Sequence, residues 1–170
     1  DTPLHRDNFI KLVNEGWYDG SPFHRIINGF MIQGGHSGKT GDGRVDPGYL
    51  IDAEILPNHY HKKGVLAAAR MGDAVNPEKQ SSGSQFYIVQ GQVVPLTYLE
   101  RASSSTGFKY TEEMKRTYAT LGGTPHLDGG YTVFGEVVMG LDVVDKIAAV
   151  KTGRGDVPVE EITMTVELVD

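Results

Sequence analysis

Residues 34–40 carry the first pattern that could bind a ligand. They read GGHSGKT, with the glycines and the final Lys-Thr pair of a phosphate-binding loop. The spacing is wrong by one residue, because the position that must be glycine is Gln33. No helical pattern follows Thr40 to supply the helix N-terminus that binds a phosphate group. We therefore do not expect nucleotide binding.

The second pattern is a group of metal-ligand types. His59 and His61 lie near Asp52 and Glu54 in the sequence, and imidazole and carboxylate groups bind several divalent metals. The four residues occur in a loop-like stretch without the fixed spacing of a metal motif. Solvated histidines are the simpler interpretation, and we predict no metal site.

Two further patterns are incomplete. Asp42 and Asp46 lack the alternating oxygen ligands of a calcium loop. Ser84 lacks the elbow motif of a serine hydrolase. Neither calcium binding nor hydrolysis is therefore expected.

The composition excludes several classes of protein. A chain of 170 residues fits one domain with a single core. Its net charge of -6 argues against a nucleic-acid or anionic-membrane partner, because either would meet like charge. The absence of cysteine excludes disulfides, thiolate zinc sites and cysteine nucleophiles. Nothing resembles a signal peptide or a membrane span, and the compartment, cytoplasm or bacterial periplasm, stays open.

The elements that would position a site begin with a helix and a hairpin. Thr2 can cap a helix that has Pro3 at its first position. Residues 23–27 and 30–33 are two β-rich runs joined by Asn28-Gly29, the dipeptide that best fits a two-residue type I′ turn. The glycine-rich residues 34–50 predict a long surface loop.

Further strands are predicted over residues 65–70, 84–89 and 131–138. Apolar residues at helical spacing over 141–148 predict a second covering helix, and alternation over 162–168 predicts a half-buried final strand. Several short strands with two covering helices indicate an antiparallel barrel or sandwich.

Residues 92–124 interrupt this pattern. Thr111 can cap a helix, and Met114, Tyr118 and Leu121 then share one helical face. We predict one domain over residues 1–170 with a helical insertion at about 92–124, whose apolar face packs on the barrel rather than on a partner.

Three blocks of sequence, in order, resemble the cyclophilin family of peptidyl-prolyl cis-trans isomerases. Residues 23–35 read FHRIINGFMIQGG and resemble the family's signature hairpin. Residues 64–70, GVLAAAR, and 82–88, SGSQFYI, resemble the next two core strands. Residues 126–135, HLDGGYTVFG, resemble the segment that closes the proline pocket. Together with the second helix and the last strand, the resemblance covers most of the chain outside residues 92–124.

The resemblance implies a mainly β fold, an eight-stranded antiparallel barrel capped by two helices. The sequence departs from the family at its start, because members normally open with a strand pair before the first helix. Those opening strands are apparently missing from this chain, through cleavage or omission, or else the barrel is open. An open barrel would expose unpaired strand edges.

The activity implied is rotation about X-Pro peptide bonds, without a cofactor. Rotation destroys amide resonance, so a catalyst should grip the prolyl ring and donate a hydrogen bond to the twisted nitrogen. By resemblance Arg25 is that donor, with Gln33 and Phe30 beside it as catalytic residues. The other residues that the resemblance assigns to substrate binding are Met31, Ala69, Arg70, Gln85, Tyr87, His126, Leu127 and Tyr131.

The resemblance also assigns particular roles. Ala69 and Arg70 offer backbone groups to the substrate chain. Tyr87 stands where many members carry phenylalanine, and Tyr131 where many carry histidine. His126 stands where some members carry a tryptophan associated with cyclosporin binding, which leaves binding of that drug open while catalysis need not change.

In an ideal hairpin with a two-residue turn, the alternation of side chains between the two faces would not bring these site residues together. Arg25 would share a face with Ile27, Phe30 and Ile32, while Gln33 would point the other way. A bulge, strong twist or barrel curvature would have to redirect some side chains.

The implied partners are proline-containing peptides and unfolded or partly folded proteins, bound by a monomer that assists folding. The alternative is a module of the same fold that binds proline segments without turnover. Arg25, Gln33 and Gln85 favour the enzyme, because a pure binder has less need of a donor aimed at the twisted nitrogen.

Overall fold

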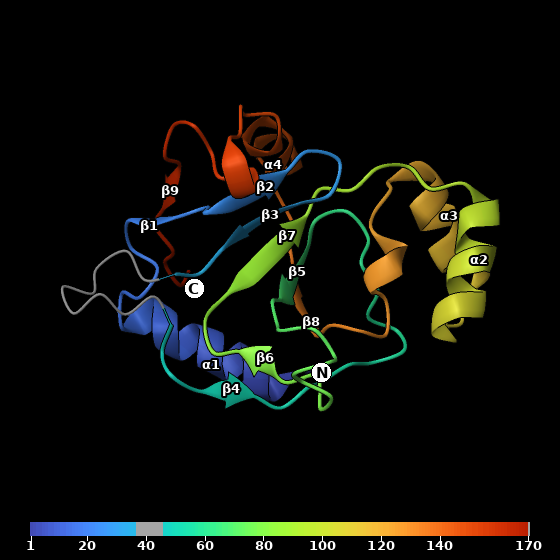
Figure 1. Ribbon diagram of the computed structural model, residues 1–170, viewed down its shortest axis with the longest axis horizontal. Coiled ribbons are helices and arrows are strands. Elements are labelled where there is room, and N and C mark those ends of the chain that lie inside the picture. The colour runs from blue at the N-terminus through green and yellow to red at the C-terminus, as the bar shows by residue number, and fades with distance from the viewer. Residues whose placement is uncertain (37–45, 170) are drawn as a thin grey trace.

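The computed structural model describes residues 1–36 and 46–169, and its architecture is mainly β with four α-helices (Figure 1). The largest sheet has five antiparallel strands, in the spatial order β2 (Arg25–Ile27), β3 (Met31–Gly34), β7 (Phe86–Val89), β5 (Val65–Ala68) and β8 (Val133–Glu136). Two small pairs join β1 (Ser21–Pro22) to β9 (Thr163–Met164) and β4 (Leu50–Ile51) to β6 (Ser81–Ser82). Within the described residues the sheets do not close into the eight-stranded barrel that the resemblance implies.

Two helices pack on one face of the large sheet, as the sequence predicts. Helices α1 (Pro3–Asn14) and α4 (Leu141–Ala148) contribute Leu12 and Val144 to a core with Ile26, Ile32 and Phe86 of the sheet. The opposite face carries a second cluster around Met31, Tyr87 and Val89. The large sheet therefore has one face covered by α1 and α4 and a second face that carries the cluster around Met31, Tyr87 and Val89.

The β2–β3 hairpin corrects the predicted turn. Ile27 pairs directly with Met31, so three residues, Asn28, Gly29 and Phe30, form the loop instead of two. Gly29 has a φ of 79°, a left-handed conformation that glycine adopts without steric cost. A turn longer by one residue reverses which side chains share a face.

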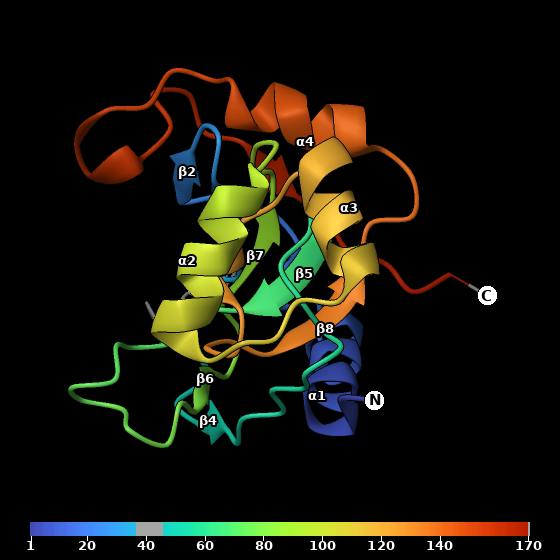
Figure 2. The same ribbon diagram turned by 90° about the vertical axis from the view of Figure 1, so that its right-hand side faces the viewer.

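Residues 92–124 form the predicted helical segment. It contains α2 (Leu96–Thr106) and α3 (Glu112–Thr120), and a short 3-10 helix, η1 (Pro125–Leu127), follows it. Figure 2 shows α2 and α3 side by side, and Figure 1 places them at the end of the molecule away from β1 and β9. The Thr111 hydroxyl accepts from the Met114 amide at 3.2 Å, so the predicted cap is confirmed. Tyr118 is fully buried, whereas Leu121 is partly exposed.

The start of α1 and the end of the chain differ from the sequence prediction. Thr2 makes no capping bond, and the Glu54 carboxylate instead accepts from the Leu4 and His5 amides at 3.1 and 3.0 Å. The final strand shortens to Thr163–Met164, paired with β1. The remaining short helix, η2 (Arg154–Asp156), lies beside β2. Residues 37–45, which include Asp42 and part of the glycine-rich pattern that we do not expect to bind a nucleotide, lie outside the described residues.

Candidate functional site

A row of four side chains crosses the sheet on the face opposite α1 and α4. Arg25 pairs with Gln33, Gln33 with Tyr87, and Tyr87 with Ala67. Directly paired residues project from the same face of a sheet, so their side chains are neighbours. No bulge is needed to bring Arg25 and Gln33 together, because the three-residue turn already does so.

A pocket of about 160 Å³ lies over this row. Its wall combines three residues of the row with the β2–β3 hairpin, the residues that follow β5, the end of η1 and the segment between η1 and β8. Its lining residues are Arg25, Phe30, Met31, Gln33, Ala69, Arg70, Tyr87, Leu127 and Tyr131. Nine of the eleven residues predicted for the site therefore lie around one cavity, whose lining combines apolar and aromatic side chains with the polar side chains of Arg25, Gln33 and Arg70.

The Arg25 guanidinium is at the mouth of this pocket. Its side chain is 44% exposed, and its Nε lies 3.4 Å from Oδ2 of Asp156 in η2. Asp156 has a φ of 61°, which an aspartate adopts only at some cost. The sequence analysis missed this acidic partner, since the two residues are 131 positions apart and no motif links them.

Gln85 lies outside the pocket but contacts it through Gln33. The Gln33 Nε2 donates to Gln85 Oε1 at 3.2 Å. Gln85, Gln33, Ala69 and Arg70 also line an adjoining hollow of about 560 Å³. Exposed Met71 and Val75 form part of that hollow, so the pocket continues into a wider groove with apolar edges.

Arg70 contributes its side chain to the site. The guanidinium lies 4.5 Å from the centroid of the Tyr131 ring and is only 4% exposed. Its Nε donates to the Gly130 carbonyl at 2.7 Å and its Nη1 contacts Asp73 at 2.7 Å. The sequence analysis assigned Arg70 only a backbone role, because stacking of an arginine on an aromatic ring leaves no local sequence signal.

The backbone of Ala69, which we expected to bind the substrate chain, forms hydrogen bonds within the protein instead. Its N–H donates to the Gln85 carbonyl at 3.0 Å, and its carbonyl accepts from the Ser82 amide at 2.8 Å. The N–H group of Ala69 is therefore not available to a substrate chain, and its methyl group lines the pocket.

His126 lies at the rim and not in the pocket lining. Its ring centroid is 5.3 Å from that of Phe30. Burial, and the nearby His61, lower the pKa of His126 below its ordinary value. The neutral imidazole therefore extends the aromatic surface around Phe30 at physiological pH.

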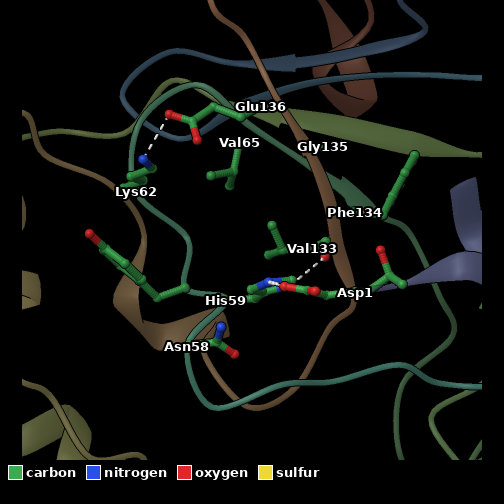
Figure 3. Close-up of a pocket in the computed structure, with 11 residues that line it drawn as sticks. Asp1, Asn58, His59, Lys62, Val65, Val133, Phe134, Gly135 and Glu136 are labelled. Atoms are coloured by element: carbon green, nitrogen blue, oxygen red, sulfur yellow. Dashed lines mark hydrogen bonds and ion pairs between the residues drawn. The ribbon is translucent and has the colours of Figure 1, made fainter.

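Another hollow, of about 320 Å³, lies beside the outer edge of β8 and is lined by none of the residues predicted for the site (Figure 3). Lys62 and Glu136 form an ion pair of 2.7 Å at one side. His59 contacts Asp1 at 3.2 Å at the other. The charged groups at both sides of this hollow are therefore paired with one another.

The four residues of the suspected metal group are dispersed. His61 contacts Asp128, whereas Glu54 binds His5 and Asp52 accepts from Gln80. Within residues 1–36 and 46–169, no cluster of three metal-ligand side chains occurs. In the same ranges, none of the helices is long and apolar enough to cross a bilayer. Ser84 is buried without a basic partner in the described part of the chain.

Comparison with known proteins adds independent information. Residues 1–167 match the family described as cyclophilin type peptidyl-prolyl cis-trans isomerase/CLD. A putative bifunctional phosphatase/peptidyl-prolyl cis-trans isomerase of Streptococcus pyogenes serotype M6 is 41% identical over 96% of this chain, which spans 33% of that protein. A putative peptidyl-prolyl cis-trans isomerase of Staphylococcus saprophyticus is 36% identical over 99% of this chain and 82% of its own length.

Solved structures show the same relationship. The crystal structure of a cyclophilin type peptidyl-prolyl cis-trans isomerase from Cryptosporidium parvum aligns with a TM-score of 0.67 and 26% identity. The alignment covers 96% of this chain and 82% of that one. A structure of the same protein in the presence of the dipeptide Ala-Pro aligns with a TM-score of 0.66.

Proposed function

The chain belongs to the family of cyclophilin-type peptidyl-prolyl cis-trans isomerases, and we propose from this membership that it rotates X-Pro bonds in the pocket beside Arg25. The observation that carries the proposal is the position of the permanently charged, partly exposed Arg25 side chain in the lining of a pocket that also contains Phe30 and Met31. Apolar and aromatic side chains in the wall suit a prolyl ring, and the reaction needs a donor close to that ring.

The chemistry requires no bond cleavage. Rotation about the peptide bond costs about 18–20 kcal/mol because it destroys amide resonance. In the twisted state the proline nitrogen becomes pyramidal and gains a lone pair that can accept a hydrogen bond. Arg25 donates to that lone pair, which is available only in the transition state, so the bond accelerates rotation instead of merely binding substrate. A factor of about 10⁵ in rate corresponds to roughly 7 kcal/mol of such differential stabilisation.

The remaining site residues bind the substrate chain. Phe30, Met31, Leu127 and the two tyrosines, Tyr87 and Tyr131, enclose the prolyl ring. Gln33, oriented by its hydrogen bond to Gln85, offers an amide group to the flanking backbone, and the adjoining groove next to Met71 and Val75 receives a neighbouring side chain. The Ala-Pro dipeptide used with the Cryptosporidium parvum relative is a ligand of the size that this pocket admits.

The wider setting of the reaction belongs to the same proposal. Residues 1–170 act as one domain, with residues 92–124 inserted between strands, and the full eight-stranded barrel remains the proposed form of the fold. The substrates are proline-containing segments of unfolded or partly folded proteins. Assistance to protein folding follows, because uncatalysed X-Pro isomerisation takes tens to hundreds of seconds.

The test is cis-to-trans conversion of a short X-Pro peptide, compared between the wild type, Arg25→Ala and Arg154→Ala. Arg154 is an exposed arginine in η2 and serves as the matched control. We expect Arg25→Ala to lower turnover by at least about a hundredfold, similar to the loss of one oxyanion-hole donor. Arg154→Ala should leave turnover unchanged, and both variants should keep the wild-type melting temperature.

Undiminished turnover in a folded Arg25→Ala protein would contradict the role of Arg25. A folded wild type without turnover would instead favour the alternative function, a module that binds proline segments without isomerising them.

A further inference from the structure

A chain of hydrogen bonds connects helix α3 to the pocket. The Tyr118 hydroxyl donates to Asp128 Oδ2 at 2.6 Å. Asp128 Oδ1 lies 2.9 Å from His61 Nδ1, and His61 Nε2 lies 2.8 Å from the Tyr87 hydroxyl. All four side chains are at most 5% exposed, and they come from four different segments of the sequence. These hydrogen bonds therefore form a buried network that extends from α3 to Tyr87, a residue of the pocket lining.

One arrangement of protons satisfies every group in this chain. An ionised Asp128 accepts from Tyr118, from His61 Nδ1–H and from the His61 backbone amide, the last at 2.7 Å. His61 Nε2 then accepts from the Tyr87 hydroxyl. Burial raises the pKa of Tyr118 and of Tyr87, so both hydroxyls keep their protons. Buried networks in which all members are paired hold their side chains in one geometry.

The two end members of this hydrogen-bond network, Tyr87 and Tyr118, have different surroundings. The Tyr87 ring lines the pocket and meets the Tyr131 ring edge to face at 5.9 Å, while its hydroxyl is bound to His61. Tyr118 packs against Tyr60 and Tyr110 at 5.4 and 5.9 Å, in a cluster that also contains Val94 and Leu99 of residues 92–124. Tyr87 therefore lines the pocket, whereas Tyr118 belongs to the helical segment.

The backbone reinforces the same connection. The Thr124 amide donates to the His61 carbonyl at 2.8 Å, and Gly123 forms bridges with Lys62 and Gln92. A Cβ at Gly123 would lie 2.2 Å from the His61 carbonyl oxygen and 2.6 Å from the Tyr118 ring. Residues 92–124 thus contact the segment that precedes β5 at His61 and Lys62.

We propose that His61, Asp128 and Tyr118 are positioning residues that fix the Tyr87 ring in the wall of the proline pocket. By this route residues 92–124 contribute to substrate binding without touching the substrate. The proposal rests on the isomerase function proposed above. A wall that is held before binding loses less freedom when the prolyl ring enters. Because the wall meets the ring equally in the ground and transition states, the network acts on KM and not on kcat.

The first test is Tyr118→Phe, which removes one hydroxyl and keeps the ring. Loss of a hydrogen bond of about 1 kcal/mol should raise KM by roughly fivefold, with kcat within about twofold of the wild type. The matched control is Tyr60→Phe, because the Tyr60 ring packs on Tyr118 outside the hydrogen-bond chain. We expect Tyr60→Phe to leave KM unchanged. A purely structural role would lower the active fraction, so kcat would fall and KM would stay constant.

The second test combines Tyr118→Phe with Tyr87→Phe. Tyr87→Phe alone should raise KM, since the ring loses its anchor. In that background Tyr118→Phe should have no further effect on KM, although it should still lower the urea midpoint of unfolding. An unchanged KM in Tyr118→Phe, or an equal increase in both backgrounds, would overturn the proposal. The ¹⁵N shifts of His61 provide a direct readout, with the proton on Nδ1 in the wild type.

Failure of the proposed function gives a different result. If the wild type binds an Ala-Pro peptide without turnover, its dissociation constant replaces KM in the same set of variants. The roughly fivefold weakening in Tyr118→Phe and its absence in the Tyr87→Phe background would then still support the network, and equal binding by all variants would refute it.

Discussion

Arg25 and Gln33 stand directly opposite each other in the β2–β3 pair, on the face of the sheet that carries the pocket. A two-residue turn would have paired Arg25 with Ile32 and sent Gln33 to the other face. The three-residue loop shifts the register by one, and a shift of one residue exchanges the faces of every side chain on a strand. The length of one turn thus decides whether the donor and the amide group meet.

Gly29 is the residue on which this turn depends. Its φ of 79° is left-handed, so Gly29→Ala should lower the free energy of unfolding by about 1–2 kcal/mol. The new Cβ would lie 2.3 Å from Gln92 Nε2, the free end of a flexible side chain that can move away. Gly20→Ala is the matched control, because Gly20 has a φ of 71° in open space and should show a similar loss. Urea unfolding measures both, and a neutral Gly29→Ala would contradict the left-handed turn.

Gln33 and Gln85 should act as one unit in catalysis. Their side chains are joined by a hydrogen bond of 3.2 Å, and only Gln33 lines the pocket. We expect Gln85→Ala to lower kcat/KM by about fivefold, equivalent to roughly 1 kcal/mol, because Gln33 loses the group that orients it. In a Gln33→Ala background the same substitution should have almost no effect. Additive losses in the double variant would mean that Gln85 acts on the substrate independently of Gln33.

Asp156 should moderate the activity of Arg25. The carboxylate is 44% exposed and 3.4 Å from the guanidinium, so the pair should contribute less than about 1 kcal/mol to stability. Asp156→Asn keeps a side chain that tolerates the left-handed backbone and removes the competing charge. We expect kcat/KM to rise about twofold at low salt and to lose its salt dependence, since salt screens exposed charges. A large fall in kcat/KM would show instead that Asp156 orients Arg25 for catalysis.

The helices and the large sheet could be predicted because their signals are local. Pro3 at a first helical position identified α1, periodicity identified α4 and the apolar face of α3, and β-rich runs identified β2, β3, β5, β7 and β8. The turn between β2 and β3 was wrong by one residue, since Asn28-Gly29 fits both a two-residue loop and the three-residue loop that forms. The cap of α1 was also wrong, because Glu54 comes from about 50 residues away and no local pattern can indicate it.

The site shows the same limit. The resemblance named the residues around the pocket, and nine of them line one cavity in the structure. It did not indicate the ion pair of Arg25 with Asp156, the stacking of Arg70 on Tyr131, or the contact between His61 and Tyr87. Each of these depends on tertiary geometry between distant segments, which residue types and spacing do not encode.

The Glu54 side chain should contribute more to the stability of α1 than the Thr2 side chain does. Its carboxylate accepts from two free amides of the first turn and contacts His5 Nδ1 at 2.6 Å. Glu54→Gln removes the charge that interacts with the helix N-terminus, so the free energy of unfolding should fall by about 1–2 kcal/mol. Thr2→Val is the control, since the Thr2 hydroxyl makes no capping bond and its loss should cost much less. Equal effects in urea unfolding would show that Glu54 is not the cap.

His24 should make the protein less stable in acid. Burial, the stacked ring of His36 at 3.8 Å and the neighbouring Arg25 lower the pKa of His24 to about 4. The unfolded chain takes up this proton near pH 6.5, while the folded protein resists it until about pH 4. The stabilising contribution is therefore complete above pH 6.5 and declines as the pH falls towards 4. The urea midpoint of the wild type should drop between pH 7 and pH 5, whereas between pH 8 and pH 7 it should stay constant.

His24→Gln should show a smaller drop in the urea midpoint, because its side chain does not titrate. His5, whose pKa burial also lowers, accounts for part of the drop that remains. An identical drop in His24→Gln would show that other groups carry the entire pH dependence.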